Sequence, residues 1–114
     1  MAAGELNLTV EQGTTFSQTL TWKIDNVLVN LTGYTARMQA REDVTSSDTI
    51  LSLTQASGIT LGGAAGTIVI ALNAASTAAL VAGNYVYDLE LVSGAGVVTR
   101  LVQGTFTVSA EVTR

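Results

Sequence analysis

The chain has 114 residues, a formal net charge of −4 and only 12% charged side chains, a composition that fits one domain with a hydrophobic core. It contains no Cys, His or Pro, which excludes disulfides and zinc–thiolate sites and removes the commonest general base near neutral pH. We therefore expect a single domain over residues 1–114 that is not an enzyme, with no catalytic, cofactor-binding or metal-binding residues and no cofactor.

The distribution of charge also bears on partners. The five basic residues are dispersed and form no electrostatic footprint for nucleic acid, and no apolar run approaches the ~20 residues of a membrane span. The N-terminus has no basic region and no apolar core, so we expect no signal peptide. For the reasons above, we expect neither a membrane nor a nucleic acid as a partner. No residue between Asp48 and Asp88 is charged. A subunit packed among neighbours would tolerate this, and so would a surface solvated by Thr and Ser hydroxyls; both explanations stay open.

The first part of the chain alternates between apolar and polar residues, which predicts extended strands. We expect one strand over Leu6–Val10 and a second over Thr14–Ile24. Gln18 interrupts the apolar face of the second strand, so it should lie near a sheet margin or bind a backbone partner. Trp22 suits either the core or an exposed interface anchor, and its parity with Phe16 favours the core.

The middle of the chain consists of short extended segments between turns. Glu42–Thr49 is polar, and its three acids lack the spacing of an EF-hand, which favours a solvated loop over a calcium site. Gly62–Gly66 lacks the Lys and Ser/Thr of a phosphate-binding loop and precedes a strand, which favours a hairpin loop. Strands are expected over Tyr34–Arg41, Ile50–Leu53, Ile59–Leu61 and Thr67–Leu72.

The cleanest alternation follows a short helical turn expected near residues 74–80, which Asn73 can cap. Gly83 reverses the chain, and the strand Asn84–Val92 then places four large side chains on one side: Tyr85, Tyr87, Leu89 and Leu91. A turn glycine followed two residues later by Tyr85 resembles the tyrosine corner of immunoglobulin-like sandwiches, in which the hydroxyl bonds backbone a few residues upstream. A plain turn before a hairpin strand is the alternative.

The chain closes with a hairpin at Ser93–Gly96 and a returning strand, Val97–Gln103. Gly104 should permit a bulge or kink before Thr105–Val108 resumes the strand, and the tail from Ser109 should be extended. Together these elements predict an all-β fold. We expect an immunoglobulin-like antiparallel β-sandwich of about 7–9 short strands, with one short helical turn near residues 74–80.

The remaining chemistry favours contact over catalysis. Asp88 and Glu90 share one strand face two residues apart, whereas glycosidase carboxylates normally come from different elements. We expect them to pair across strands with Arg37, Arg41 or Arg100. A sandwich also has edge strands whose free N–H and C=O groups can accept a partner strand, and this chain has no Pro and little charge to guard them.

Two stretches, Phe16–Lys23 and Val29–Arg41 with its Leu-Thr-Gly turn, precede a Gly-x-Tyr strand and the hairpin triplet Val98-Thr99-Arg100. This order resembles the small β-sandwich of tailed-phage structural proteins, as in the N-terminal domain of the siphophage upper baseplate protein. The resemblance runs from about Leu8 to Val108 and contains no catalytic motif.

The resemblance implies a non-enzymatic structural component of a tailed-phage virion, acting as a tail, baseplate or fibre-attachment adaptor. Its expected location is the virion, after synthesis in the host cytoplasm. Its expected partners are other virion structural proteins and copies of itself in a symmetric assembly. A capsid decoration or head-fibre protein is one alternative. The other is a free carbohydrate-binding module, which needs an aromatic platform drawn from Phe16, Trp22, Tyr34, Tyr85, Tyr87 and Phe106.

Overall fold

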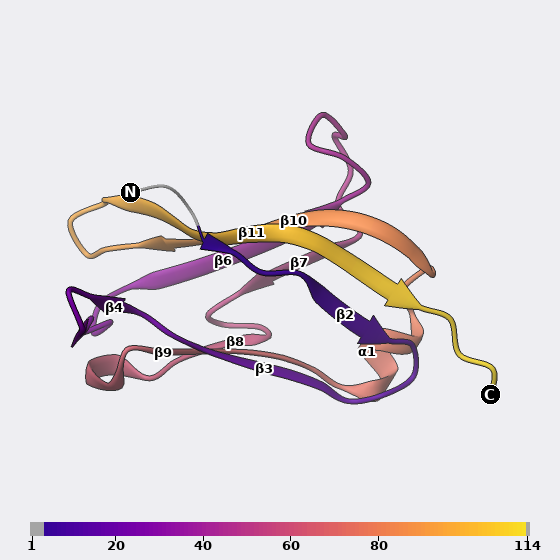
Figure 1. The fold of residues 1–114 in the computed structure, drawn as a ribbon, viewed down its shortest axis with the longest axis horizontal. Helices are drawn as coiled ribbons and strands as arrows, with labels where there is room; N and C mark the ends of the chain where they lie inside the picture. The colour runs from indigo at the N-terminus through magenta and orange to yellow at the C-terminus, as the bar shows by residue number, and fades with distance from the viewer. Residues whose placement is uncertain (1–3, 114) are drawn as a thin grey trace.

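A computed structural model describes residues 4–113, which form two β-sheets packed face to face and a separate two-stranded hairpin (Figure 1). The larger sheet has the order β1-β11-β10-β6-β7, with β2 also paired to β11, and the smaller sheet has the order β3-β9-β8. The strands are β1 (Gly4–Glu5), β2 (Leu8–Glu11), β3 (Phe16–Thr21), β4 (Lys23–Ile24), β5 (Val27–Leu28), β6 (Thr35–Arg41), β7 (Leu51–Thr54), β8 (Ile59–Leu61), β9 (Thr67–Leu72), β10 (Gly83–Val92) and β11 (Val98–Ser109).

The strand order is that of an immunoglobulin-like sandwich, as predicted. Strands β3, β9 and β8 occupy the places of strands B, E and D, while β11, β10, β6 and β7 occupy those of G, F, C and C′. A 3-10 turn (η1, Gly63–Ala65) joins β8 to β9, so the expected hairpin loop is confirmed. The helix α1 (Ala74–Ala78) falls within the predicted helical turn, and the Asn73 side chain accepts a hydrogen bond from Ser76 N–H. No helix in the described part of the chain is long and apolar enough to cross a membrane.

The core is built from alternate residues of the two sheets. All four inward residues of β10 are buried, as the alternation predicted. Phe106, Ile68 and Val10 are fully buried against them, and each such side chain contributes about 1.5–3 kcal/mol to stability relative to exposure. Trp22 is also a core residue, in edge-to-face contact with Tyr34 at a ring-centroid distance of 6.1 Å. The core assignment of Trp22 is therefore confirmed.

The tyrosine corner is present at the start of β10. The Tyr85 hydroxyl donates a 2.7 Å hydrogen bond to the carbonyl oxygen of Val81, four residues upstream. Tyr87, the next inward residue, donates a 2.6 Å hydrogen bond to the carbonyl oxygen of Leu6. These two hydroxyls tie β10 to the turn before it and to the N-terminal segment, which lies 81 residues away in sequence.

The second predicted strand ends earlier than expected. Strand β3 stops at Thr21. The Trp22 N–H still donates to Gly66 in continuation of the β3–β9 register, but the Trp22 carbonyl accepts from Val29. Residues beyond Trp22 therefore leave the smaller sheet and form the separate β4–β5 hairpin. The interaction of Trp22 with two different segments could not be deduced from the uninterrupted alternation.

The bulge expected at Gly104 is also misplaced. The register between β10 and β11 shifts at Leu101, which is the extra residue, and this lets the neighbours Leu101 and Val102 both pack against the core. Gly104 lies within continuous pairing, opposite Tyr87. A Cβ at Gly104 would clash with the Leu6 carbonyl, so the glycine serves close approach of the N-terminal segment.

The N-terminal strands depart from the antiparallel expectation. Both β1 and β2 run parallel to β11, and the expected strand Leu6–Val10 is observed as β2 (Leu8–Glu11). The other ladders of the described residues are antiparallel. Because β1 and β2 lie beside β11, neither covers β3, where strand A lies in constant-type immunoglobulin domains.

Candidate interaction surface

The outer side of the larger sheet carries two ion pairs. Arg37 Nε lies 2.7 Å from Glu90 Oε1, and Arg100 Nε lies 3.3 Å from Asp88 Oδ2. The predicted cross-strand pairing is therefore confirmed for two of the three arginines. Each exposed pair contributes about 0.2–1 kcal/mol, so their main effect is to fix strand register. Both carboxylates are directed to arginines rather than to a common reacting point.

The third arginine of this face lines an open hollow beside β10. Arg41 donates hydrogen bonds to the Ser46 carbonyl oxygen at 3.0 Å and to Gln39 Oε1 at 2.8 Å. Val44 and Val86 complete that side of the hollow. The Arg41 guanidinium is thus used to hold the loop that follows β6. The acids that line the hollow, Asp88 and Glu90, are paired with Arg100 and Arg37.

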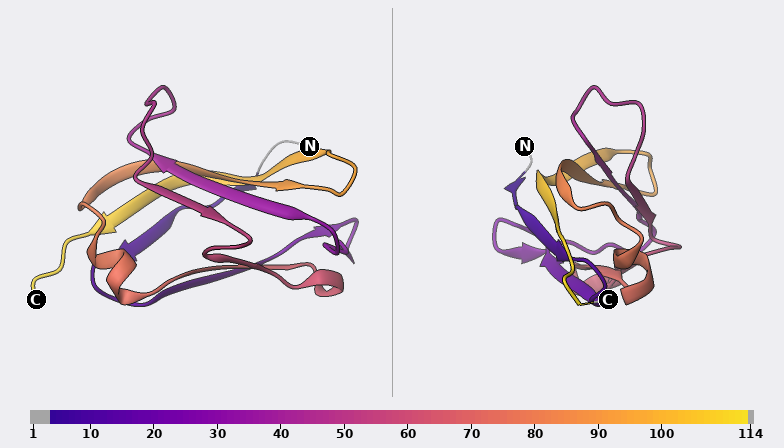
Figure 2. Two further views of the ribbon diagram at one scale, coloured as in Figure 1. Left: turned by 180° about the vertical axis from the view of Figure 1, so that it is seen from behind. Right: turned by 90° about the vertical axis from the view of Figure 1, so that its right-hand side faces the viewer.

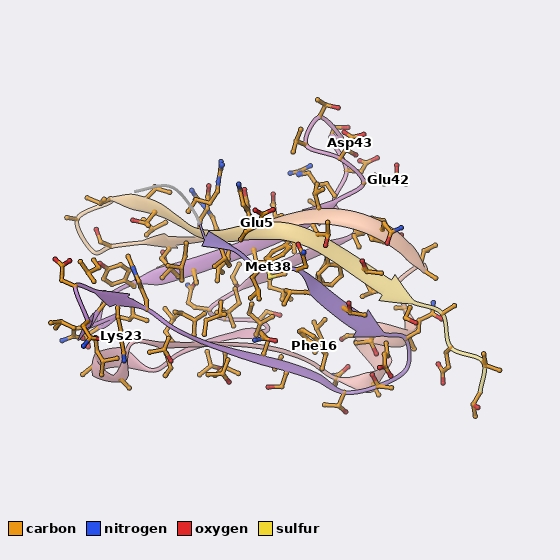
Figure 3. The ribbon with its side chains drawn as sticks, in the orientation of Figure 1. Glu5, Phe16, Lys23, Met38, Glu42 and Asp43 are labelled. Atoms are coloured by element: carbon orange, nitrogen blue, oxygen red, sulfur yellow. The ribbon has the colours of Figure 1, made fainter. Side chains whose placement is uncertain are left out.

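The acidic loop between β6 and β7 projects away from the sandwich, as Figures 2 and 3 show. Asp43 Oδ1 accepts hydrogen bonds from Thr45 Oγ1 at 2.7 Å and from Thr45 N at 2.9 Å. These bonds hold the pKa of Asp43 below its usual value, and the bond from the Thr45 hydroxyl has the largest effect. Over residues 4–113, no group of three or more acids is gathered to hold a metal ion. The loop is exposed, as expected.

None of the six aromatic side chains is exposed, and four of them are buried core residues. The remaining two, Phe16 and Tyr34, are half-buried and pack against the core. Figure 3 places Phe16 on the inner side of β3. A carbohydrate platform needs aromatic faces open to solvent, so the surface of the described residues does not provide one.

The smaller sheet differs from the larger in charge and in its edge. None of its three strands carries a charged residue. Strand β3 forms one margin of this sheet and pairs only with β9, in unbroken register from Phe16–Leu72 to Thr21–Thr67. Six residues without Pro, charge or bulge therefore present one free edge to solvent, which native monomers usually guard.

The backbone groups at this edge can be assigned from one hydrogen bond. Trp22 N–H donates to the Gly66 carbonyl, and this pair continues the β3–β9 register. Hydrogen-bonded pairs alternate along an antiparallel ladder, so even-numbered residues of β3 direct their N–H and C=O groups at β9. The groups of Ser17, Thr19 and Thr21 point outward, and none of them is hydrogen-bonded to a described residue.

The other strand margins are less suited to accept a partner. Strands β7 and β8 have four and three residues, against six in β3. Strands β1 and β2 carry Glu5 and Glu11, charges of the kind that protect an edge. The β3 edge is therefore the best candidate interaction surface among the described residues.

Gln18 gave the only sequence signal for this edge. It was expected near a sheet margin or with a backbone partner, and it lies in the middle of the marginal strand β3. Its side chain is half-buried on the inward side and makes no hydrogen bond within residues 4–113. The sequence did not predict which neighbour of β3 would be missing, because that depends on where the N-terminal strands pair.

Comparisons with known proteins give only distant structural likenesses. No protein-family model matches the chain, and no curated protein is significantly similar to it. The extracellular domain of the voltage-gated sodium channel beta4 subunit has a TM-score of 0.44 and 11% identity, with 98% of this chain and 97% of that chain covered. Domains 3–5 of Drosophila OTK give a TM-score of 0.39 and 16% identity, covering 92% of this chain and 33% of that chain.

A second structure of sodium channel beta subunits gives a TM-score of 0.37 at 11% identity, covering 97% of this chain and 96% of that chain. Values of this size support no inference about partners or function. The immunoglobulin-like assignment therefore depends on the observed strand order and on the tyrosine corner at Tyr85.

Proposed function

We propose that the chain is a non-enzymatic structural subunit that acts through protein–protein contacts, with the β3 edge as its contact site. The observation that carries this proposal is the uncharged, unbulged edge of β3, with outward backbone groups on three residues. Such an edge adds main-chain hydrogen bonds to any extended partner that lies beside it. The ion pairs of the larger sheet, in contrast, are already satisfied within the chain.

The assembly that we propose is a tailed-phage virion, in which the chain is a tail, baseplate or fibre-attachment adaptor. The resemblance of Phe16–Lys23 and Val29–Arg41 to the baseplate sandwich supports this assignment, and the first of these stretches contains the free edge strand. A neutral smaller sheet fits a subunit whose surface is covered by neighbours. Other virion proteins and further copies of the chain are the proposed partners.

Quantitative mass spectrometry of purified virions whose genome encodes the chain tests this function. We expect the chain at a fixed stoichiometry to the major tail protein, retained through a density gradient. Presence in the lysate with no chain in purified particles would contradict the proposal. If the chain is retained only by particles with tails, the capsid decoration alternative is also excluded.

A further inference from the structure

The side-chain types of β3 are arranged symmetrically about its third residue, Gln18. From Phe16 to Leu20 the strand reads apolar, hydroxyl, Gln, hydroxyl, apolar. Antiparallel pairing of two identical strands about a two-fold axis places each residue opposite the one equally far from the axis. An axis through Gln18 therefore pairs like with like.

The alternation of faces restricts this pairing. For two copies of the smaller sheet to join with both inner faces on the same side, the two residues of each facing pair must have equal parity. An axis through Gln18 satisfies this and sets Phe16 opposite the partner's Leu20 and Ser17 opposite the partner's Thr19. The free N–H and C=O groups of Ser17 and Thr19 then form the hydrogen-bonded pairs, since they point outward.

The neighbouring register is less favourable. An axis through Thr19 would set Gln18 opposite the partner's Leu20, so that a polar amide faces an apolar side chain. The axis through Gln18 sets Phe16 opposite the partner's Leu20 instead. It also places two half-buried amides next to each other, neither of which has a hydrogen-bond partner within its own chain's described residues.

We infer that a second copy of this chain binds at the β3 edge, through antiparallel pairing of β3 with β3 about a two-fold axis at Gln18. The two smaller sheets then form one continuous six-stranded sheet, with order β8-β9-β3-β3-β9-β8. Phe16 and the partner's Leu20 cover each other on both sides of the axis. This inference rests on the proposed function and names the partner of the same edge.

Charge at the edge tests the pairing. Thr19→Lys adds a side chain on the exposed face of β3, so the fold should persist by circular dichroism while the Kd for self-association rises about tenfold or more. Thr60→Lys is the matched control, an exposed Thr on the opposite margin of the same sheet. Sedimentation equilibrium should show Thr60→Lys and wild type dimerising alike. A dimer equally stable in Thr19→Lys would overturn the inference.

Single cysteines test the register, because the natural chain has no Cys. Gln18→Cys faces its symmetry mate across a pair without hydrogen bonds, where Cα atoms lie about 4.5 Å apart and a disulfide fits. Thr19→Cys is more exposed, yet its mate lies on a diagonal at about 7–8 Å, beyond disulfide reach. In a glutathione buffer we expect a covalent dimer of Gln18→Cys only.

Cross-linking of Thr19→Cys instead of Gln18→Cys, or a wild-type chain that stays monomeric at millimolar concentration, would overturn the two-fold pairing. Particle composition is measured separately. A chain that is stoichiometric in virions but never pairs through β3 would contradict this inference and leave the proposed function standing. If the chain forms a dimer with the expected cross-link but is absent from virions, the inference stands and the proposed function is contradicted.

Discussion

At the scale of single residues, the tyrosine corner is the clearest link between sequence and structure. The Tyr85 hydroxyl holds the Val81 carbonyl, so Tyr85→Phe should lower the free energy of unfolding by about 0.5–1.5 kcal/mol. Tyr34→Phe is the control, because the Tyr34 hydroxyl makes no hydrogen bond within residues 4–113. Urea denaturation of both variants measures the difference. Equal effects would show that the corner bond is not stabilising.

Tyr87 gives the protein a predicted sensitivity to alkali. Burial raises the pKa of Tyr87 to about 12, against a usual value near 10. Stability from the neutral hydroxyl is therefore complete below pH about 10 and is lost as the pH rises to about 12. Phenolate absorbance and circular dichroism should change together in this window. Tyr87→Phe should flatten the loss, and an unchanged alkaline transition would contradict the assignment.

At the scale of elements, the strands with strict alternation were predicted well. The inward set of β10 was correct because a strand buried on one face must repeat every two residues. The end of β3 at Thr21 was missed, because the alternation continues through Trp22 while the Trp22 carbonyl accepts its hydrogen bond from Val29. The bulge at Leu101 was missed because it depends on packing two consecutive apolar residues on one core.

Gly104 provides a test at the scale of one strand pair. Its Cβ would meet the Leu6 carbonyl and lie 2.8 Å from Asn7 Oδ1, an atom that accepts a hydrogen bond from Thr105 N. Gly104→Ala should therefore lower the free energy of unfolding by about 1–3 kcal/mol. Gly94→Ala is the control, since its Cβ would meet no atom closer than 3.7 Å. Thermal unfolding that does not separate the two variants would contradict this role.

At the scale of the whole molecule, the two sheets differ in character. The larger sheet carries two ion pairs on its outer face, whereas the strands of the smaller sheet have no charged residue. The sequence showed the neutral stretch between Asp48 and Asp88 but not that β3 joins it to form one neutral sheet. Nor did it show which edge is free, because that depends on parallel pairing of β1 and β2 with β11. The contact surface was thus predicted in kind and located only by the topology.

Residue-resolved amide hydrogen exchange at two protein concentrations tests the β3 edge most directly. In the dilute chain, the amides of Gln18 and Leu20 should be protected by β9, while those of Ser17 and Thr19 should exchange freely. In the concentrated chain, the amides of Ser17 and Thr19 should become protected as β3 pairs with β3. Amides of Ser17 and Thr19 that exchange equally fast at both concentrations would contradict the account.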